Sequence, residues 1–344
     1  MIVIASFAGA VLIAAAILAS LLSVALILAL SPWLKVYALA RPNARSSHRE
    51  PTPQGAGAAV IVATLLAAWL GAALLGVIVP GPPREFLALT IAALALAVGG
   101  AVDDIHPLSV GFRLALQCAA VALVLAFIPA DFRLVPALPW WVERAGLLLG
   151  GVWFVNLTNF MDGIDWMTVA EAVPITGAII IMGLLGIVPA LPLTVAVALL
   201  GAIVGFAPFN KPVARLFLGD VGSLPIGLLL AWLLFHVAIG GHLVAALLLP
   251  LYYLADTALT LLRRAQAPEP IWQAHRSHYY QRATDGGFAV KTIVLRVFLV
   301  NLGLAALALI TVAHPHGGVS AITLAAGAGL VGGLLASFAR GRKI

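Results

Sequence analysis

The chain has little charge and almost no cysteine. Of its 344 residues, 9% are charged and 63% are hydrophobic, and its mean hydropathy is +1.11. Soluble domains are about 25% charged and about 45–50% apolar, so this composition excludes a soluble enzyme and a disordered chain. The single cysteine, Cys118, lies in an apolar run and excludes a disulfide scaffold. The net charge of +6 is not gathered in one basic patch, which argues against a nucleic-acid partner.

Long apolar runs are what the chain has in abundance. Because a transmembrane helix needs about 20 mostly apolar residues, the sequence predicts an all-α, polytopic integral membrane protein of about eleven helices, with ten or twelve as alternatives. The expected spans are 3–30, 58–79, 86–102, 112–130, 145–160, 173–187, 191–208, 223–239, 242–262, 293–312 and 318–338.

The basic residues indicate the orientation in the membrane. Four of them follow the first apolar run, between positions 35 and 49, which predicts an outside N-terminus and a cytoplasmic first loop. Alternating the spans leaves Arg84, Arg133 and Arg144 outside and places the other basic residues, with the C-terminus, in the cytoplasm.

The acidic residues are the unusual feature of these spans. An Asp at the bilayer centre costs about 2.5–3.5 kcal/mol on insertion scales, so acids in apolar runs are candidate functional residues. Several of them cluster beside the spans on the predicted cytoplasmic side. We expect one domain, 1–344, with its site built from loops near 35–57, 103–111, 161–172, 209–222 and 263–291.

The first cluster is the pair Asp103 and Asp104, just before Pro107. At a helix end both carboxylates can face one partner. Two adjacent carboxylates attract a divalent cation, or one of them holds a raised pKa and serves as a base.

The second cluster is Asn156, Asn159, Asp162 and Asp165, which recur every three residues. This spacing predicts one polar stripe at a helix end. Amide and carboxylate groups suit the hydrogen-bond recognition of a base or sugar. A stripe that caps and packs helices is the alternative.

The third cluster is Asp220 between Gly219 and Gly222, with Ser223 following. Ser223 is expected to cap the next helix, whose N-terminus favours an anion. Asp220 would then hold Mg²⁺ beside a phosphate, since Mg²⁺ commonly uses one or two carboxylates plus substrate phosphates. The alternative is an Asp in a turn.

The fourth cluster is a basic loop that contains His275, Arg276, His278 and Arg282. Histidine and arginine suit an anionic diphosphate, and the arginine guanidinium can bind it with two hydrogen bonds. Zinc is disfavoured because no cysteine pair accompanies the histidines. A loop that is merely positive on the cytoplasmic side would explain the charge but not the two histidines.

With these clusters in order, the chain resembles the polyprenyl-phosphate N-acetylhexosamine-1-phosphate transferase family, glycosyltransferase family 4. The stretches RSSH and HRSHYYQ look most like the sequences of its O-antigen initiating branch. The matching stretches are RPNARSSHREPTPQGAG (41–57), VDDIHPLSVGFRLALQ (102–117), NLTNFMDGID (156–165), GFAPFNKPVARLFLGDVGS (205–223), YLADTALTLLRR (253–264) and HRSHYYQR (275–282).

The resemblance implies transfer of a sugar-1-phosphate from a UDP-N-acetylhexosamine to polyprenyl (undecaprenyl) phosphate, which gives a polyprenyl-diphospho-sugar and UMP. It implies Mg²⁺ as cofactor, with Mn²⁺ as an alternative. The expected place is the bacterial inner (plasma) membrane with the site facing the cytoplasm, at the first membrane step of lipopolysaccharide-type surface polysaccharide synthesis. Membrane lipids are further partners, and a homodimer stays open.

The resemblance also implies residue roles. Asp103, Asp104, Asp162 and Asp165 would be catalytic, and Asp220 with Asp103 would hold the metal. Direct attack of the lipid phosphate is favoured over a covalent intermediate on Asp103 or Asp104. The substrate-binding residues would be Asn156, Asn159, Asn210, His275, Arg276, His278, Arg45 and His48.

The chain departs from the family pattern at several positions. Ala40 and Arg41 stand where an acid is usual, and Gln54 and Ala56 replace a basic residue and a glycine. Trp166 replaces the last glycine of the family's DGIDG run. Beside the site, Trp166 is expected to alter the nucleotide or sugar pocket.

Two other classes of membrane protein fit the sequence less well. A membrane prenyltransferase would need two Asp-rich DxxxD helices, which DDIHP and DGID do not match. A secondary transporter would place its acids at the midplane within inverted repeats, whereas here they lie at one face and no repeat is visible.

Overall fold

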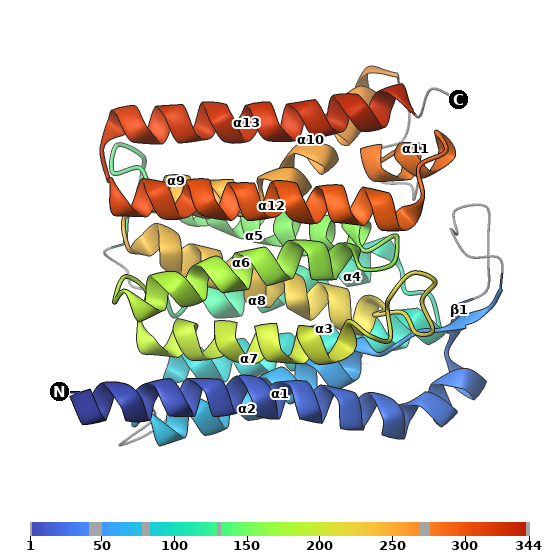
Figure 1. Ribbon diagram of the computed structural model, residues 1–344, viewed down its shortest axis with the longest axis horizontal. Coiled ribbons are helices and arrows are strands. Elements are labelled where there is room, and N and C mark those ends of the chain that lie inside the picture. Colours follow the sequence, from blue (N-terminus) through green and yellow to red (C-terminus); the bar gives the residue numbers. More distant parts are fainter. Residues whose placement is uncertain (1, 41–49, 78–82, 129–131, 268–275, 342–344) are drawn as a thin grey trace.

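The computed structural model describes residues 2–40, 50–77, 83–128, 132–267 and 276–341. They form a bundle of helices with one short strand pair, β1 (Leu39–Ala40) and β2 (Thr52–Pro53) (Figure 1). The helices are α1 (Ile2–Tyr37), α2 (Gly57–Leu74), α3 (Arg84–Ile105), α4 (Val110–Leu125), α5 (Trp140–Met161), α6 (Met167–Leu184), α7 (Ala190–Phe206), α8 (Asp220–Ile239), α9 (Leu243–Leu248), α10 (Leu251–Gln266), α11 (Tyr279–Asp285), α12 (Val290–Ala313) and α13 (Gly317–Arg340).

The helices have the length and composition of membrane spans. In the described part of the chain, seven are long and apolar enough to cross a bilayer: α1, α2, α3, α6, α8, α12 and α13. The predicted multi-pass membrane architecture is therefore supported, while the count of about eleven spans and the outside N-terminus stay predictions. The start of α1 and the end of α13 lie at opposite ends of the bundle (Figure 1), as an odd number of crossings requires.

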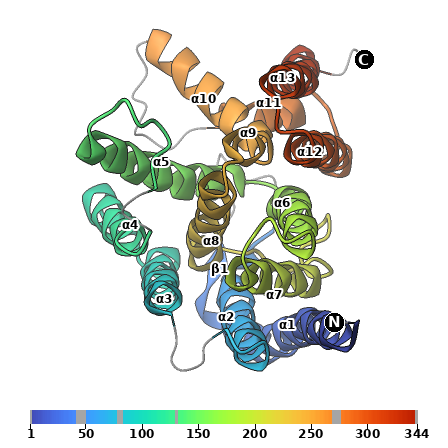
Figure 2. The ribbon, with the colours of Figure 1, turned by 90° about the vertical axis from the view of Figure 1, so that its left-hand side faces the viewer.

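One predicted span is wrong. The run 242–262 is not a single helix, because α9 ends at Leu248 and α10 begins at Leu251. Pro250 lies between them, and proline has no N–H for the helix and clashes with the preceding turn. Beyond this break α10 diverges from the bundle (Figure 2). A short helix, α11, lies in the loop 263–291, where none was predicted.

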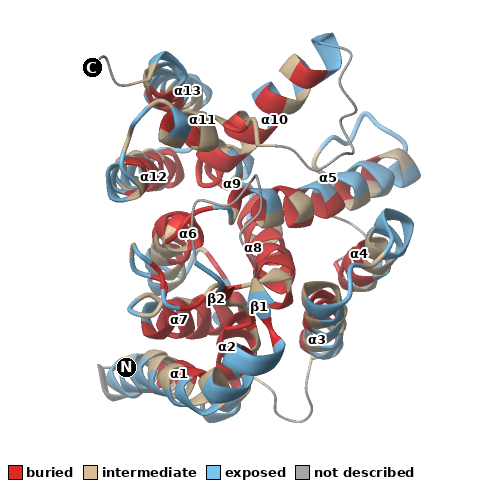
Figure 3. Ribbon diagram, turned by 90° about the vertical axis from the view of Figure 1, so that its right-hand side faces the viewer, coloured by how far each residue is buried: buried red, intermediate tan, exposed pale blue. Residues whose placement is uncertain are grey.

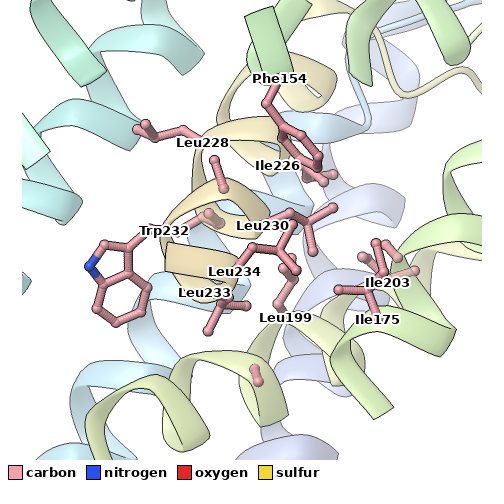
Figure 4. Close-up of a cluster of buried hydrophobic side chains, with 14 of the residues drawn as sticks. Phe154, Ile175, Leu199, Ile203, Ile226, Leu228, Leu230, Trp232, Leu233 and Leu234 are labelled. Atoms are coloured by element: carbon pink, nitrogen blue, oxygen red, sulfur yellow. The ribbon is translucent and has the colours of Figure 1, made fainter. Parts of the chain in front are cut away.

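Helix α8 forms the centre of the bundle. Figure 2 shows α2, α3, α5, α6, α7 and α9 around it, and Figure 3 shows that it is almost wholly buried. Leu230 and Leu233 of α8 belong to one cluster of buried apolar side chains with Phe154 of α5 and Leu199 of α7 (Figure 4). A helix enclosed in this way has little freedom to move, so its two ends are well-fixed points.

Residues 53–57, at the end of the polar segment 35–57, are joined to the α7–α8 connection by backbone pairing. Strands β1 and β2 are antiparallel, with Leu39 opposite Pro53. Gln54 then forms a parallel bridge with Phe217, and its side-chain amide donates to the carbonyl of Asp104 at 2.9 Å. Gln54, one of the departures from the family pattern, therefore joins the first loop to the end of α3.

A buried polar contact joins α6 to α12. The amide of Asn301 donates to Oε2 of Glu171 at 2.6 Å and to the carbonyl of Ala170 at 3.0 Å. Both side chains are 1% exposed. Since lipid offers such groups no partner, this contact contributes to how the two helices associate.

We predict that Asn301→Leu destabilises the protein, because it leaves the buried Glu171 carboxyl without its amide donor. The expected loss is about 1–3 kcal/mol, measured by thermal unfolding in detergent. The double variant Glu171→Leu/Asn301→Leu removes both polar partners and should recover most of the loss. An unchanged unfolding temperature for Asn301→Leu would contradict the prediction.

Candidate functional site

The N-terminus of α8 is capped by a carboxylate from another helix. Oδ1 of Asp104, near the end of α3, accepts the N–H of Asp220 at 3.0 Å, and Oδ2 accepts the N–H of Val221 at 3.1 Å. The first N–H groups of a helix lack intrahelical partners and carry partial positive charge, which an anion stabilises. The predicted cap, Ser223, is wrong: α8 begins at Asp220, so Ser223 already lies inside its first turn.

Asp220 is oriented by an amide from α5. Nδ2 of Asn159 donates to Oδ1 of Asp220 at 2.7 Å and to the hydroxyl of Ser223 at 2.9 Å. The carboxyls of Asp103 and Asp104 lie close to that of Asp220. The structure thus brings together four of the predicted site residues, from α3, α5 and α8.

Asp103 is held by the chain that follows α3 and by α4. Its Oδ1 accepts the N–H of Leu108 at 2.5 Å, and its Oδ2 pairs with Nη1 of Arg113 at 3.0 Å. This arrangement turns the chain sharply after α3 and places one positive charge beside the acidic cluster.

Asp162 lies next to these carboxyls, directly after α5. Burial of its carboxyl raises the pKa of Asp162 to about 8, and the charges of Asp220, Asp104 and Asp165 raise this pKa further, while a hydrogen bond from the hydroxyl of Thr168 opposes the shift. The residue as a whole remains partly exposed. At pH 7, without a bound cation, the carboxyl is therefore mostly protonated.

The predicted polar stripe is only partly correct. Helix α5 ends at Met161, so Asp162 and Asp165 lie beyond it in the turn that contains Gly163, and a three-residue period alone does not distinguish a helix from such a turn. The amide of Asn156 donates to Gln117 of α4 and to the carbonyl of Val152. Its visible role is to join α4 and α5.

Two glycines allow the helices of the site to touch backbone to backbone. A Cβ atom on Gly100 of α3 would lie 2.4 Å from the carbonyl of Asp220, and a Cβ on Gly57 of α2 would lie 2.1 Å from Cα of Gly222. Contacts under 3.0 Å are essentially never made by real Cβ atoms. Small residues at these positions let α2 and α3 approach α8 closely, which brings Asp104 within reach of the α8 N-terminus.

The segment 162–166 is joined to the α7–α8 connection. Oδ2 of Asp165 accepts the N–H of Ala214 at 2.9 Å. Oδ1 of Asn210 accepts the N–H of Trp166 at 2.7 Å, while its Nδ2 donates to the carbonyl of Leu216 at 3.1 Å. The side chains of Asp165 and Asn210, predicted as catalytic and substrate-binding, are both buried and take part in holding the two segments together.

Trp166 adopts a left-handed backbone conformation, with φ +63° and ψ +5°. For an L-residue this region costs about 1–2 kcal/mol, and for a bulky residue it is an outlier. The conformation explains why glycine suits this position in the family pattern. Here a tryptophan occupies it.

The basic loop is connected to the site through α11. His278, 2% exposed, places Nδ1 3.1 Å from Oδ1 of Asp256, which also accepts the N–H of Tyr279 at 3.0 Å. The hydroxyl of Tyr280 donates to the carbonyl of Phe160 at 2.9 Å. Asp256 is not among the predicted site residues, although an acid within an apolar run was a signal for it.

The other predicted substrate-binding residues are not joined to the acidic cluster in the same way as His278. Arg276 pairs with Asp285 at 3.0 Å, so part of its charge is used within the loop. His275, Arg45 and His48 lie outside the described residues. Of the basic candidates, the structure thus fixes His278 and Arg276 in position, and both have carboxylate partners of their own.

The acidic cluster suits a cation that keeps some of its water. Within the described ranges, no group of three or more His, Cys, Asp or Glu residues is arranged to hold a metal ion. Asp104 uses both oxygens on N–H groups of α8, so Asp220 is the first candidate ligand. Asp103 would join it by exchanging its contact with Arg113 for the cation. Mg²⁺ is commonly bound by one or two carboxylates, with water and substrate phosphates completing its shell, so the residues present fit Mg²⁺ bound together with a phosphate substrate.

Comparison with known proteins gives a consistent picture. The sequence model of glycosyl transferase family 4 matches residues 86–238. A Synechococcus phospho-N-acetylmuramoyl-pentapeptide-transferase is 31% identical, over 68% of this chain and 71% of its own. A probable undecaprenyl-phosphate N-acetylglucosaminyl 1-phosphate transferase of Bacillus subtilis is 26% identical, over 78% and 75%. A decaprenyl-phosphate N-acetylglucosaminephosphotransferase of Mycobacterium leprae is 27% identical, over 77% and 74%.

The raised pKa of Asp162 predicts a pH-dependent stability. A carboxyl that binds its proton more tightly in the folded state stabilises the fold fully below its unfolded pKa of about 3.9, and this contribution is lost as the pH rises through the folded value. That value is about 8. In detergent with a chelator, the unfolding temperature should fall from pH 6 to pH 9, and it should fall less for Asp162→Asn.

Glu50→Gln, at an exposed position, is the control for this experiment and should show the wild-type fall. The same fall for Asp162→Asn as for wild type would contradict the prediction.

The backbone contact at Gly100 predicts that even a methyl group is harmful there. Gly100→Ala should destabilise the protein by about 1–3 kcal/mol, as overpacking does, because the new Cβ would meet the backbone of Asp220. Nothing lies within 4 Å of a Cβ on Gly150 of α5, so the matched variant Gly150→Ala should be neutral or stabilise by up to about 1 kcal/mol. Thermal unfolding compares the two, and equal stabilities would refute the proposed contact.

Proposed function

The chain belongs to the polyprenyl-phosphate N-acetylhexosamine-1-phosphate transferases of glycosyl transferase family 4, and on this premise we propose its reaction. It transfers an N-acetylhexosamine-1-phosphate from a UDP-sugar to a polyprenyl phosphate and releases UMP. The observation that carries the proposal is the meeting of Asp103, Asp104 and Asp220 at the N-terminus of α8, with Asn159 oriented onto Asp220. A membrane prenyltransferase or a transporter would not share this family.

We assign the site to the cytoplasmic face of a bacterial inner membrane. Arg84 and Arg144 belong to the helix ends opposite the acidic cluster, whereas Lys211, Arg215 and Arg282 lie in segments that adjoin it. Basic residues favour cytoplasmic segments. This face is also where a UDP-sugar would arrive.

The donor sugar and the downstream polymer are proposed from the named relatives and from two sequence stretches. The Bacillus and mycobacterial relatives are named for N-acetylglucosamine phosphate transfer to undecaprenyl or decaprenyl phosphate. An N-acetylhexosamine donor is accordingly the proposal for this chain. The stretches RSSH and HRSHYYQ support an O-antigen-like surface polysaccharide as the polymer that is built on the lipid-linked product.

The reaction proceeds best as one displacement. A phosphate monoester has a second pKa near 6, so the acceptor is mostly dianionic at pH 7 and needs no general base. One of its oxygens attacks the β-phosphorus of the UDP-sugar, the bond from that phosphorus to the bridging oxygen breaks, and UMP leaves with the electron pair. Asp104 is a poor nucleophile here because both its oxygens bind N–H groups of α8, and a covalent bond to it would uncap that helix.

The other residues of the cluster position the metal ion, which neutralises charge on the substrate. Asp220 and Asp103 would hold Mg²⁺, and Asn159 keeps the Asp220 carboxyl in a fixed orientation through its 2.7 Å hydrogen bond. Mg²⁺, when bound, supplies positive charge to the diphosphate of the donor. Preorganised charge of this kind is the main requirement of phosphoryl transfer.

The test is a transfer assay in membranes that contain the full chain, with UDP-N-acetylglucosamine labelled in the sugar and undecaprenyl phosphate. Label should move to the organic phase with one UMP released for each sugar transferred. Asp220→Asn should lower turnover at least about a hundredfold, the scale of a lost charge-stabilising group.

Asp285→Asn, on the exposed end of α11 with a side chain 56% exposed, is the matched control and should keep most of the activity. Wild-type turnover in Asp220→Asn would overturn the assignment of Asp220. No transfer by the wild type from any of a panel of UDP-N-acetylhexosamines would overturn the proposed reaction.

A further inference from the structure

Trp166 holds a backbone conformation that large side chains avoid. Among the residues described by the structure it alone combines a positive φ with a side chain, and it directly precedes α6. Glycine adopts this conformation without hindrance. Strained residues persist where the surrounding structure over-determines them, and they cluster at functional sites. The hydrogen bonds made by Trp166 therefore indicate why a tryptophan is kept in this strained conformation.

Both nitrogens of Trp166 donate to the α7–α8 connection. Its backbone N–H binds Oδ1 of Asn210 at 2.7 Å, and its indole N–H binds the carbonyl of Ala207 at 2.6 Å. Ala207 lies at the start of the connection, directly after α7. A glycine at position 166 could make the first of these bonds but not the second, so the indole is what this chain adds.

The two segments joined by Trp166 lead to two acids of the cluster. Asp162 lies four residues before Trp166, and the connection that begins at Ala207 ends at Asp220. Oδ2 of Asp165, three residues after Asp162, accepts the N–H of Ala214 in this connection at 2.9 Å, so the two segments lie against each other. A shift of the connection relative to segment 162–166 would therefore change the separation of these groups.

We propose that Trp166 is a positioning residue of the transferase site. Its indole N–H fixes the start of the α7–α8 connection, and it thereby holds the connection that leads to Asp220 against the segment 162–166 that contains Asp162. The inference rests on the proposed function and deepens it, since it adds a second contact to the Asp104 cap in holding the acidic cluster together. Trp166 acts through other residues, and no contact with substrate is part of the proposal.

A role in packing alone makes a different prediction. Trp166 is only partly buried, and glycine would relieve its backbone strain. If the indole only filled space, Phe would replace it well and glycine would replace it badly. If the indole N–H is the essential group, Phe is the worse substitution, because it keeps the strain and loses the bond.

The first measurement is amide hydrogen exchange on the full chain in detergent, without substrate. Trp166→Phe and Trp166→Gly should both raise exchange in residues 207–219 by about tenfold, since local opening sets this rate. Trp166→Gly should nevertheless unfold at a higher temperature than Trp166→Phe. The control Trp141→Phe, at a position 68% exposed at the start of α5, should match wild type in both measurements.

The second measurement separates positioning from substrate contact. Both Trp166 variants should lower kcat about tenfold and leave KM for each substrate within about twofold, because small displacements of reacting groups lower the rate of the chemical step. Wild-type exchange in Trp166→Phe would overturn the inference, and so would a raised KM with unchanged kcat. If the wild type transfers no sugar phosphate, the proposed function fails, while the exchange measurement still decides whether Trp166 fixes the connection.

Discussion

The bond between the Asp104 carboxylate and the N-terminus of α8 is the contact on which the rest of the site depends. Both oxygens bind backbone N–H groups, so Asp104 fixes the end of α3 to the start of α8 in one register. An anion at a helix N-terminus contributes about 0.3–1 kcal/mol when exposed and up to about 2 kcal/mol when partly buried. Asp220, as the first residue of α8, takes its position from this bond, and Asn159 then orients its side chain.

The central helix explains why the chemistry lies at one end of the bundle. The middle of α8 carries buried apolar side chains, such as Leu230 and Trp232, that pack against its neighbours. The helix therefore gives the cluster a rigid support. Sites on rigid elements hold their groups more accurately than sites on loops. The remaining groups come from segments that are individually tied down, through Asp165 and Asn210 on one side and Gln54 on the other.

The sequence predicted which acidic residues lie together, but it did not predict the hydrogen bonds that hold them there. Acids flanked by glycine in apolar runs predicted that Asp103, Asp104 and Asp220 share one face, and they do lie together. That Asp104 caps α8 could not be predicted, because the two partners of this bond are 116 residues apart and only the packing of α3 on α8 brings them together. Pro250 is present in the sequence, but the long apolar run around it favoured one uninterrupted span, 242–262, over the two helices α9 and α10.

The backbone contacts of Gly57 and Gly100 have a consequence for genetics. Neither residue carries a chemical group, yet each sets the spacing between α8 and a neighbouring helix to within the width of one carbon atom. In a mutational scan scored by growth, loss-of-function alleles should therefore gather at these two glycines as densely as at the carboxylates. Allele counts alone would not separate residues that perform the reaction from residues that bring the reacting groups together.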